Sequence, residues 1–332
     1  MIKDPNRQAR QFVIQLIKTT ASEGVCQFKT DYHRALLHFL NDWRDTADEV
    51  YTPSIKQLSL LTCEANGGTT TQAILILAVW RLVQMAVKLL DDVEDGDIDS
   101  RRAEVINIAL GLLTLAQLAL TKASGNTIGL LSSFNRTFFR ACDGQYDDIR
   151  IGYGQVPYPD PQTWLEIAQA KSGEFLGWAA WSGAAVASVD VPILTYYWRY
   201  GYYLGILLQL ADDFNGIWNP EEVSDLIRGS LSLPICYALS VISPKEQTDL
   251  TQLLERARHG DTHSEALIRQ RLIDLGAQAY LLVVAQIQYQ QAVTALQQAN
   301  YPTSDDFGLV KLLMKVMPGL RYAALSFDKA SS

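Results

Sequence analysis

Carboxylates gather where an apolar stretch of the chain ends. The segment Leu89–Asp97 reads LLDDVEDGD and contains Asp91, Asp92 and Asp95. Residues four apart share one face of a helix, so Asp91 and Asp95 would present their carboxylates one turn apart. Divalent metal would offset their repulsion, because Mg²⁺ takes one or two carboxylates and completes its shell with water and phosphate. Taken alone, the segment fits a solvated acidic helix end equally well.

A second segment repeats this design. Residues 205–216 read GILLQLADDFNG, and we expect an apolar helix over Tyr196–Ala211 that ends in Asp212 and Asp213. Gln209 lies three residues before Asp212 and four before Asp213, which places it on the same face. Two apolar helices that both end in paired carboxylates predict a metal-lined mouth over an apolar cavity.

Basic residues follow or separate these clusters. Arg101 and Arg102 come soon after the first cluster, and guanidinium groups bind phosphate oxygens through paired hydrogen bonds. A surface salt bridge to Asp97 or Asp99 is the alternative. Lys171 and Ser172 start an apolar helix expected over Gly173–Ala187, and the ammonium group of Lys171 is a suitable point charge for a diphosphate.

Helical patterns dominate the elements that must position these residues. Apolar residues recur at spacings of three and four, and alternating strand patterns are scarce. Long stretches of this kind are Gln8–Thr19, Asp31–Ala47 and Ile273–Ala299. Thr69–Asp95 and Val105–Thr121 are apolar nearly all round and should lie at the centre. The sequence predicts an all-α fold in one domain over residues 1–332.

Composition excludes several classes of protein. Hydrophobic residues make up 48% of the chain and charged residues 19%, which is typical of a globular protein. The net charge of −8 argues against a basic face for nucleic acid. We expect the four cysteines to be buried and reduced, because no CxxC pair occurs. A glycine between His259 and His263 makes a zinc site there improbable.

The apolar stretches do not predict a membrane protein. The N-terminus lacks the pattern of a signal peptide, since charged residues interrupt its short apolar stretch. Val105–Thr121 is the longest run without charge, and it contains Asn107, Gly111 and Gln117. We interpret it as a buried core helix rather than a transmembrane segment. We therefore expect the protein in the cytoplasm.

Taken in order, these features resemble the trans-isoprenyl diphosphate synthase (polyprenyl synthetase) family over roughly Leu58 to Leu239. A lone DDxxD motif is weak evidence, whereas an ordered set of motifs is specific. The matching segments are Asp91-Asp92-Val93-Glu94-Asp95 for DDxxD, Arg101-Arg102 for the arginine pair, Gly144-Gln145-Tyr146-Asp147-Asp148 for GQxxD, Lys171-Ser172 for Lys-Thr, Gln209 with Asp212-Asp213 for QxxDD, and Leu231-Ser232-Leu233-Pro234 for TLP.

The resemblance implies a fold and a set of roles. The fold would be an all-α bundle around a deep central cavity, usually homodimeric. Asp91 and Asp95 would hold two Mg²⁺ ions and Asp212 a third, beside the catalytic carboxylates Asp92 and Asp213. An allylic isoprenyl diphosphate would ionise and condense with isopentenyl diphosphate to give a longer polyprenyl diphosphate. The residues expected to bind the substrates are Arg101, Arg102, Lys171, Gln209, Arg228 and Lys56.

The second-substrate half departs from the family pattern. The Gly-Gly-Lys-Arg stretch that helps bind isopentenyl diphosphate should lie near Tyr51–Ile55, where the chain reads YTPSI with only Lys56 nearby. The lysine before TLP is missing, and Asp225–Ser230 offers only Arg228. The third aspartate of the second motif is Gly216, and the first motif has one extra residue before the arginine pair.

These departures leave three functions open. A prenyl-elongating transferase is the leading hypothesis. A terpene cyclase, or a transferase that prenylates an indole or a peptide, keeps the metal chemistry and explains the missing basic residues. A non-catalytic subunit of a heteromeric synthase is the third, but such a subunit would be expected to lose the carboxylates that this chain keeps.

The helix that ends at Asp91 is also expected to form a wall of the cavity. At 100° per residue, Val87 and Trp80 fall within about 40° of Asp91, and Ala86 flanks that stripe. Trp80 lies roughly 16 Å below Asp91 at 1.5 Å per residue, and it is the first large ring on the face. It is a candidate floor for the growing tail, with ordinary core packing as the alternative.

Overall fold

The computed structural model describes residues 4–23, 31–40, 53–98, 100–123, 127–188, 190–219, 224–305 and 307–316. Within these ranges the chain forms helices and turns without a β-strand, which confirms the predicted all-α fold. The chain divides into two compact units. The first unit comprises residues 1–136, 178–197 and 306–312, and the second comprises residues 137–177, 198–305 and 313–332. That they form a single domain with a central cavity stays a prediction.

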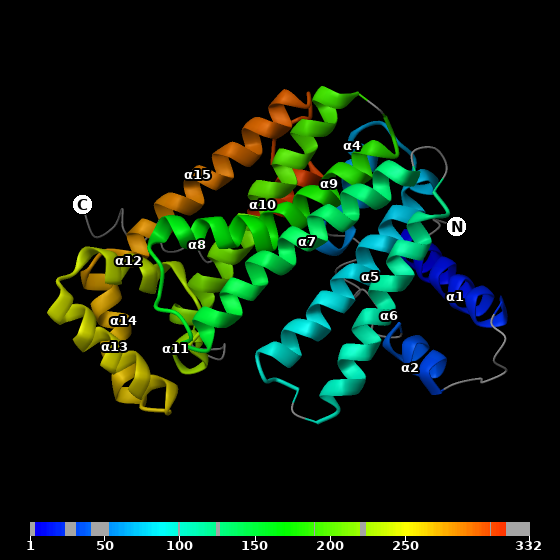
Figure 1. Ribbon diagram of the computed structural model, residues 1–332. Helices are drawn as coiled ribbons and strands as arrows, with labels where there is room; N and C mark the ends of the chain where they lie inside the picture. The colour runs from blue at the N-terminus through cyan, green and yellow to red at the C-terminus, as the bar shows by residue number, and fades with distance from the viewer. Residues whose placement is uncertain are drawn as a thin grey trace. The chain divides into compact units, whose positions relative to one another are not determined.

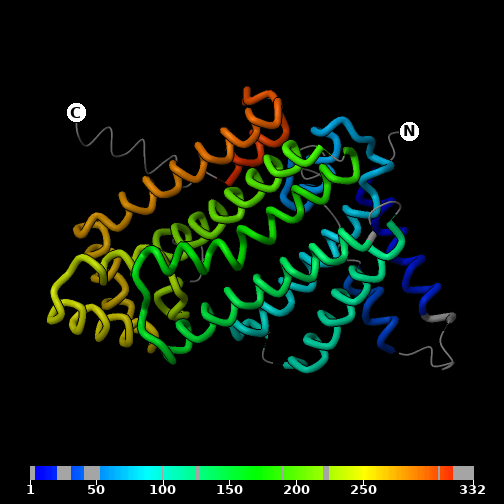
Figure 2. Tube along the Cα trace, turned by 45° about the horizontal axis from the view of Figure 1, so that its top comes forward, coloured from blue at the N-terminus to red at the C-terminus, as the bar shows by residue number. Residues whose placement is uncertain are grey.

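The first unit is built on two long helices. In Figures 1 and 2, α5 (Thr70–Glu94) and α6 (Arg102–Leu120) lie side by side. A capping box starts α5: Thr69 accepts the Gln72 amide at 3.3 Å, and the Gln72 side chain accepts the Thr69 amide at 2.8 Å. The other elements of this unit are α1 (Pro5–Glu23), α2 (Asp31–Phe39), η1 (Ile55–Gln57) and α4 (Leu58–Ala65).

Among the described residues, α5 and α6 are also long and apolar enough to cross a membrane by length and composition alone. A buried core helix meets the same criterion, and 56% of the apolar window of α5 is buried in the protein. For α6 the buried share is 44%. The absence of a transmembrane segment and the cytoplasmic location stay predictions.

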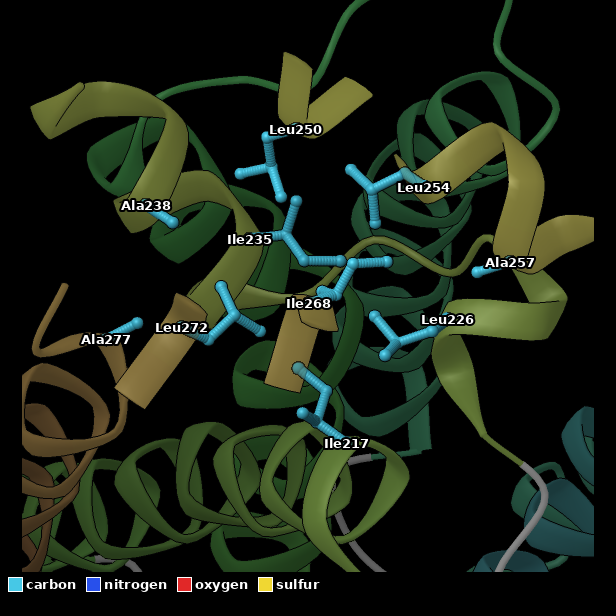
Figure 3. Packing of buried hydrophobic residues seen from close by; sticks show 10 residues of the cluster. All are labelled: Ile217, Leu226, Ile235, Ala238, Leu250, Leu254, Ala257, Ile268, Leu272 and Ala277. Carbon is cyan, nitrogen blue, oxygen red and sulfur yellow. The ribbon is translucent and has the colours of Figure 1, made fainter. Parts of the chain in front are cut away.

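The second unit is built around a hydrophobic cluster near its C-terminal helices, here called the C-terminal core. Figure 3 shows its side chains converging from several helices. Its members are Ile217, Leu226, Ile235, Ala238, Leu250, Leu254, Ala257, Ile268, Leu272 and Ala277. The contributing elements include α10 (Val191–Trp218), α11 (Asp225–Arg228), α12 (Leu233–Val241), α13 (Pro244–Arg258), α14 (Thr262–Asp274) and α15 (Ala277–Gln298).

Some helices contribute residues to both units. They are α7 (Thr127–Gly152), α9 (Glu174–Ala185), α10 and α16 (Gly308–Val316). Between α7 and α9 lie α8 (Pro161–Ala168) and the single π-helical turn η2 (Gln169–Gly173).

Two predicted helices have wrong boundaries. The helix expected over Tyr196–Ala211 begins earlier, at Val191, and continues to Trp218, because the chain offers no strong breaker before Pro220 and a pair of adjacent carboxylates disfavours a helix only weakly. The single helix expected over Ile273–Ala299 is divided at Gly276, which has a φ of +80°. Of Asp31–Ala47, residues 31–39 are helical and residues 41–47 lie outside the described part.

The expectation that the cysteines are buried also needs correction. Cys63 and Cys236 are buried thiols, but Cys142 is a thiol exposed on α7. Cys26 lies outside the described residues. Burial with the nearby Glu64 raises the pKa of the Cys63 thiol to about 11.

Candidate active site

The π-helical turn η2 is the element that presents Lys171. It joins α8 and α9 without interruption, so Lys171 and Ser172 lie within a helical stretch rather than at the start of one. A π turn carries one residue more than an α turn and is found frequently at functional sites. The stretch begins at Asp160, whose side chain accepts the Thr163 amide at 2.9 Å.

Two contacts tie η2 to the neighbouring long helices. Lys171 Nζ forms an ion pair with Asp148 Oδ2 of α7 at 2.6 Å. Ser172 Oγ donates to Gln209 Oε1 of α10 at 2.8 Å. Lys171 and Asp148 keep 25% and 24% of their side-chain surface exposed, so an incoming anion can still reach the ammonium group.

Glycines allow this close approach. A Cβ atom on Gly144 would lie 2.8 Å from the backbone nitrogen of Lys171, and one on Gly205 would lie 2.3 Å from the carbonyl oxygen of Ser172. Real Cβ atoms do not approach backbone that closely, so only glycine fits at either position. Each glycine stands four residues before a polar partner of the turn, Asp148 or Gln209. One helix face therefore supplies both the close contact and the partner.

Asp213 is the buried carboxylate of the second motif. Its side chain is only 5% exposed, and the Leu233 amide donates to its Oδ2 atom at 2.6 Å. Leu233 is the first residue of α12, so this amide is one of those that a helix leaves unsatisfied at its start. The N-cap residue, Ser232, makes no capping bond, and Asp213 caps α12 in its place.

The electrostatic surroundings of Asp213 favour its neutral form. Burial raises the pKa of its carboxyl well above the ordinary value, and the Leu233 bond acts in the opposite direction. The nearby carboxylates Asp225, Asp212 and Asp148 raise the pKa further. A bound cation would relieve this accumulation of negative charge.

A small pocket of the second unit brings several predicted residues together. Its polar lining consists of Asp148, Lys171, Gln209 and Asp213. Trp164 and its neighbours on α8, with Leu231, supply the apolar lining. Asp212 is exposed on α10, outside this lining, and Arg228 is exposed at the end of α11.

The first carboxylate motif lies in the first unit. Asp91 and Asp92 belong to the last turn of α5, and Asp95 is its C-cap residue. Negative charge at a helix C-terminus opposes the helix dipole. Lys88 offsets part of it through an ion pair with Asp92, and its pKa is raised mainly by that bond.

The two arginines after this motif hold the start of α6. Arg101 is its N-cap residue and has a left-handed φ of +65°, a conformation that costs a non-glycine residue roughly 1–2 kcal/mol. It forms an ion pair with Glu104. Asp99, one of the two partners considered for a surface salt bridge, lies outside the described residues. Arg102 Nε donates to the Ile98 carbonyl at 3.0 Å.

The predicted cavity residues differ in exposure. Trp80 is 1% exposed, and its Nε1 atom donates to the Ile55 carbonyl at 2.7 Å. Ala86 is fully buried, whereas Val87 is 37% exposed. Lys56 belongs to η1, beside that tryptophan contact. Tyr51 and Thr52, which precede it, lie outside the described residues.

Two residues of the site were not predicted. Asp148 belongs to the GQxxD segment, and the motif itself could have indicated it. Arg258 lies far along the chain on α13, where no sequence pattern singles it out. Its Nη2 atom donates to the Gly229 carbonyl and to Tyr158 Oη, both at 3.1 Å. It thereby supports the segment that leads to Leu233.

The donor set can be compared with what Mg²⁺ needs. Within the described part of the chain, no three side chains of His, Cys, Asp or Glu form a ready-made metal cage. Mg²⁺ rarely occupies such cages and is held by one or two carboxylates together with substrate phosphate. Next to Leu233, the Oγ atom of Ser232 is buried without a hydrogen-bond partner. The oxygen donors present therefore fit Mg²⁺ that arrives with a diphosphate.

Comparison with known proteins gives a consistent result. The family model for polyprenyl synthetases matches residues 55–270. A tryptophan prenyltransferase, ComQ of Bacillus subtilis, is 25% identical over 64% of this chain and 70% of its own length. A geranylgeranyl diphosphate synthase of Mycobacterium tuberculosis is 29% identical over 58% of this chain and 59% of its own. A geranylgeranyl pyrophosphate synthase of Geoglobus acetivorans is 24% identical over 84% and 86%.

Solved structures share the fold. Geranylgeranyl pyrophosphate synthetase of Pyrococcus horikoshii has a TM-score of 0.77 and 16% identity, and the match covers 94% of this chain and 95% of that one. A polyprenyl synthetase of Streptomyces coelicolor has a TM-score of 0.75 and 21% identity, with 94% and 97% covered. A polyprenyl synthase of Caulobacter crescentus, solved with calcium and isoprenyl diphosphate, has a TM-score of 0.71 and 21% identity, with 94% of each chain covered.

Proposed function

The chain belongs to the polyprenyl synthetase family and is a prenyltransferase, and from this premise we propose that it ionises an allylic isoprenyl diphosphate in the presence of Mg²⁺. The observation that supports this most is the pocket in which Lys171 stands beside Asp148, Gln209 and Asp213. A cation and carboxylates side by side are suited to a substrate that is itself an anion accompanied by metal.

Each part of the site would have a distinct task. Asp91 and Asp95 would hold two Mg²⁺ ions and Asp212 a third, with Asp92 and Asp213 as neighbouring carboxylates. Bound Mg²⁺ would neutralise the charge that develops on the departing diphosphate. Lys171 would donate to a diphosphate oxygen while it remains close to Asp148. Arg101 would also bind the diphosphate. The Caulobacter structure, which has the same fold, was solved with calcium and isoprenyl diphosphate, and this supports a divalent cation beside an isoprenyl diphosphate as the kind of ligand.

The acceptor is proposed to be isopentenyl diphosphate, which would give a longer polyprenyl diphosphate. Geranylgeranyl diphosphate synthases among the relatives support this choice. Lys56 and Arg228 would have to bind the acceptor diphosphate. The family pattern has more basic residues at these places than Lys56 and Arg228 alone. We therefore expect the Michaelis constant for isopentenyl diphosphate to exceed that for the allylic substrate.

A second candidate acceptor is an indole ring. The missing basic residues near Tyr51–Ile55 and before Leu231 support it, and so does the similarity to the tryptophan prenyltransferase ComQ. An indole carries no diphosphate, so it needs no second set of cations. The carboxylates and Lys171 would keep the same tasks in either reaction.

One experiment separates these candidates. The full chain is incubated with Mg²⁺ and geranyl, farnesyl or geranylgeranyl diphosphate, alone, with isopentenyl diphosphate, or with a tryptophan-containing peptide. Products are identified by mass spectrometry. Longer polyprenyl diphosphates support the first proposal, and a prenylated peptide supports the second. A cyclic hydrocarbon formed without acceptor would indicate a cyclase. No consumption of any allylic diphosphate would contradict the proposed ionisation.

The quaternary structure is also a proposal. The family resemblance implies a homodimer, and analytical ultracentrifugation of the full chain would test this. A monomer across the micromolar range would contradict it.

A further inference from the structure

The pocket that contains Lys171 has two walls that come from different segments of the chain. One wall is α8 with the η2 turn, which supplies Lys171, and the other contains Leu231 of the segment that leads to α12. The second wall also anchors Asp213, because α12 donates its first amide to that carboxylate. Residues 153–160, here called the α8 connection, precede the first wall, and residues 229–232, the α12 connection, precede α12. The positions of these two connections therefore set how far apart the walls stand.

Arg258, in the last turn of α13, bridges the two connections. Its Nη2 atom donates to Tyr158 Oη in the α8 connection and to the Gly229 carbonyl in the α12 connection, both at 3.1 Å. Tyr158 Oη itself donates to the Gly229 carbonyl at 3.5 Å. Burial raises the pKa of Tyr158, so its hydroxyl keeps the proton that this bond needs. One guanidinium nitrogen and one hydroxyl thus join the segments before both walls.

The two bridged residues belong to backbone with little freedom. Tyr158 lies between Pro157 and Pro159, and a proline fixes its own φ and keeps the residue before it extended. Gly229 has a left-handed φ of +74°. A Cβ atom on Gly229 would lie 2.3 Å from Nε of Arg258, so the guanidinium group lies directly against this backbone. Because neither connection can absorb a shift locally, a displacement at Arg258 is passed to both walls.

The C-terminal core holds the helix that carries Arg258. Ala257, beside it, is fully buried, and Leu254 one turn earlier is 2% exposed. The Arg258 side chain keeps 19% of its surface exposed, and Glu255, which is 57% exposed, balances its charge at 3.4 Å. The arginine is therefore fixed to the core through its backbone and to both connections through its guanidinium group.

We propose that Arg258 is a positioning residue of the diphosphate site: by holding the α8 connection and the α12 connection together, it sets the distance across the pocket between Lys171 and Asp213. The inference rests on the proposed function, because the pocket is the one proposed for the diphosphate. Arg258 does not belong to the pocket lining. It acts through the two walls and does not touch the substrate.

A purely structural role for Arg258 makes a different prediction. An arginine that only stabilised the fold would lower the melting temperature when replaced, and the folded variant would bind diphosphate like the wild type. A positioning residue changes the affinity of protein that is fully folded. It leaves kcat at saturating substrate near the wild-type value, because it makes no contact with the reacting atoms.

The experiment measures the binding of inorganic diphosphate with Mg²⁺ by isothermal titration calorimetry, and kcat and KM for farnesyl and geranylgeranyl diphosphate. All measurements are made well below the lowest melting temperature of the set. We expect Arg258→Met to weaken diphosphate binding and to raise KM about tenfold, with kcat within about threefold of the wild type.

Two control variants lie on the same helix. Leu250→Ala is the stability control, because Leu250 is a buried member of the C-terminal core on α13. It should lower the melting temperature and leave diphosphate binding unchanged. Arg256→Met is the charge control at an exposed position of α13, and it should change neither property.

A double-mutant cycle tests the route through Tyr158. Tyr158→Phe removes the hydroxyl that links Arg258 to the α8 connection, so it should weaken diphosphate binding by a smaller factor, about threefold. Combined with Arg258→Met it should add nothing further, because both substitutions break the same link. Effects that multiply would overturn the inference, and so would folded Arg258→Met protein that binds diphosphate as tightly as the wild type. Wild-type protein that binds no diphosphate with Mg²⁺ would overturn the proposed function as well.

Discussion

The backbone amide of Leu233 donates to Oδ2 of Asp213 at 2.6 Å, which joins the second carboxylate motif to the start of α12. The bond orients Asp213 in a buried position, while its neighbour Asp212 stays exposed on the same helix. Two adjacent aspartates therefore have different surroundings. Asp213 is buried and caps α12, whereas Asp212 is exposed to solvent.

Asp213→Asn is expected to change how stability depends on pH. Because burial raises the pKa of Asp213, the folded protein binds this proton more tightly than the unfolded chain does. The stabilisation that Asp213 contributes is complete below its ordinary pKa of 3.8. It is lost as the pH rises from there toward the raised pKa of the folded protein. Asparagine can still accept the Leu233 amide and carries no charge.

Melting temperatures in EDTA between about pH 4 and pH 7.5 would check this. The advantage of Asp213→Asn over the wild type should grow as pH rises. Asp249→Asn, which changes an exposed carboxylate, should show no such trend. A difference between Asp213→Asn and the wild type that stays constant over the whole range would contradict the burial argument.

Lys171→Met is expected to weaken binding of the allylic substrate. The methionine fills a similar volume but removes the charge beside Asp148, which leaves the carboxylate to repel the diphosphate. Charge-assisted hydrogen bonds contribute about 1.5–3 kcal/mol, so kcat/KM for the allylic diphosphate should fall roughly ten- to hundredfold. Lys245→Met, at an exposed position of α13, is the control. Equal kcat/KM in the two variants would remove Lys171 from the site.

Gly205→Ala is expected to displace the π-helical turn. The new Cβ atom would lie 2.3 Å from the Ser172 carbonyl oxygen, and backbone on both sides leaves no flexible atom to yield. Overpacking of this kind costs about 1–3 kcal/mol. Gly152→Ala is the matched control on α7, because nothing lies within 4 Å of its added Cβ. Chemical denaturation should separate the two variants, and equal stabilities would show that η2 can move away.

Val87→Phe is expected to shorten the product. Val87 lies one turn before Asp91 and is 37% exposed, so a larger ring there can obstruct a prenyl tail without entering the core. Ala86 is fully buried, and Ala86→Phe should mainly destabilise the protein, by about 1–3 kcal/mol. Trp80→Ala removes a buried ring and its bond to Ile55, which should cost about 3–5 kcal/mol. Product lengths by mass spectrometry and melting temperatures test all three, and an unchanged product from Val87→Phe would exclude this face as a cavity wall.

Local sequence patterns were sufficient for most of the fold. The apolar stretch Thr69–Asp95 predicted α5 within a residue at each end. The apolar pattern did not show that α10 continues past Asp213, because that pattern ends at Ala211. The tertiary bond between Asp213 and Leu233 leaves no trace in such a pattern either.

The site could be predicted only where it follows motif spacing. Gln209 and Asp213 share a helix face, and the structure places both in one pocket with Lys171. Arg258 could not be found in this way, since its position results from the packing of α13 around the C-terminal core. Contacts that join distant segments leave no periodic signal in a single sequence.

The central claim, that carboxylates of the two motifs support ionisation of an allylic diphosphate with Mg²⁺, is tested most directly by diphosphate release. Release from farnesyl and geranylgeranyl diphosphate is measured against Mg²⁺ concentration for the wild type, Asp91→Ala, Asp212→Ala and the control Asp249→Ala. We predict that wild type and control release diphosphate only with Mg²⁺, and that Asp91→Ala and Asp212→Ala fold but lose at least a hundredfold in rate, about 2.7 kcal/mol. Wild-type rates in both variants at saturating Mg²⁺ would contradict the account.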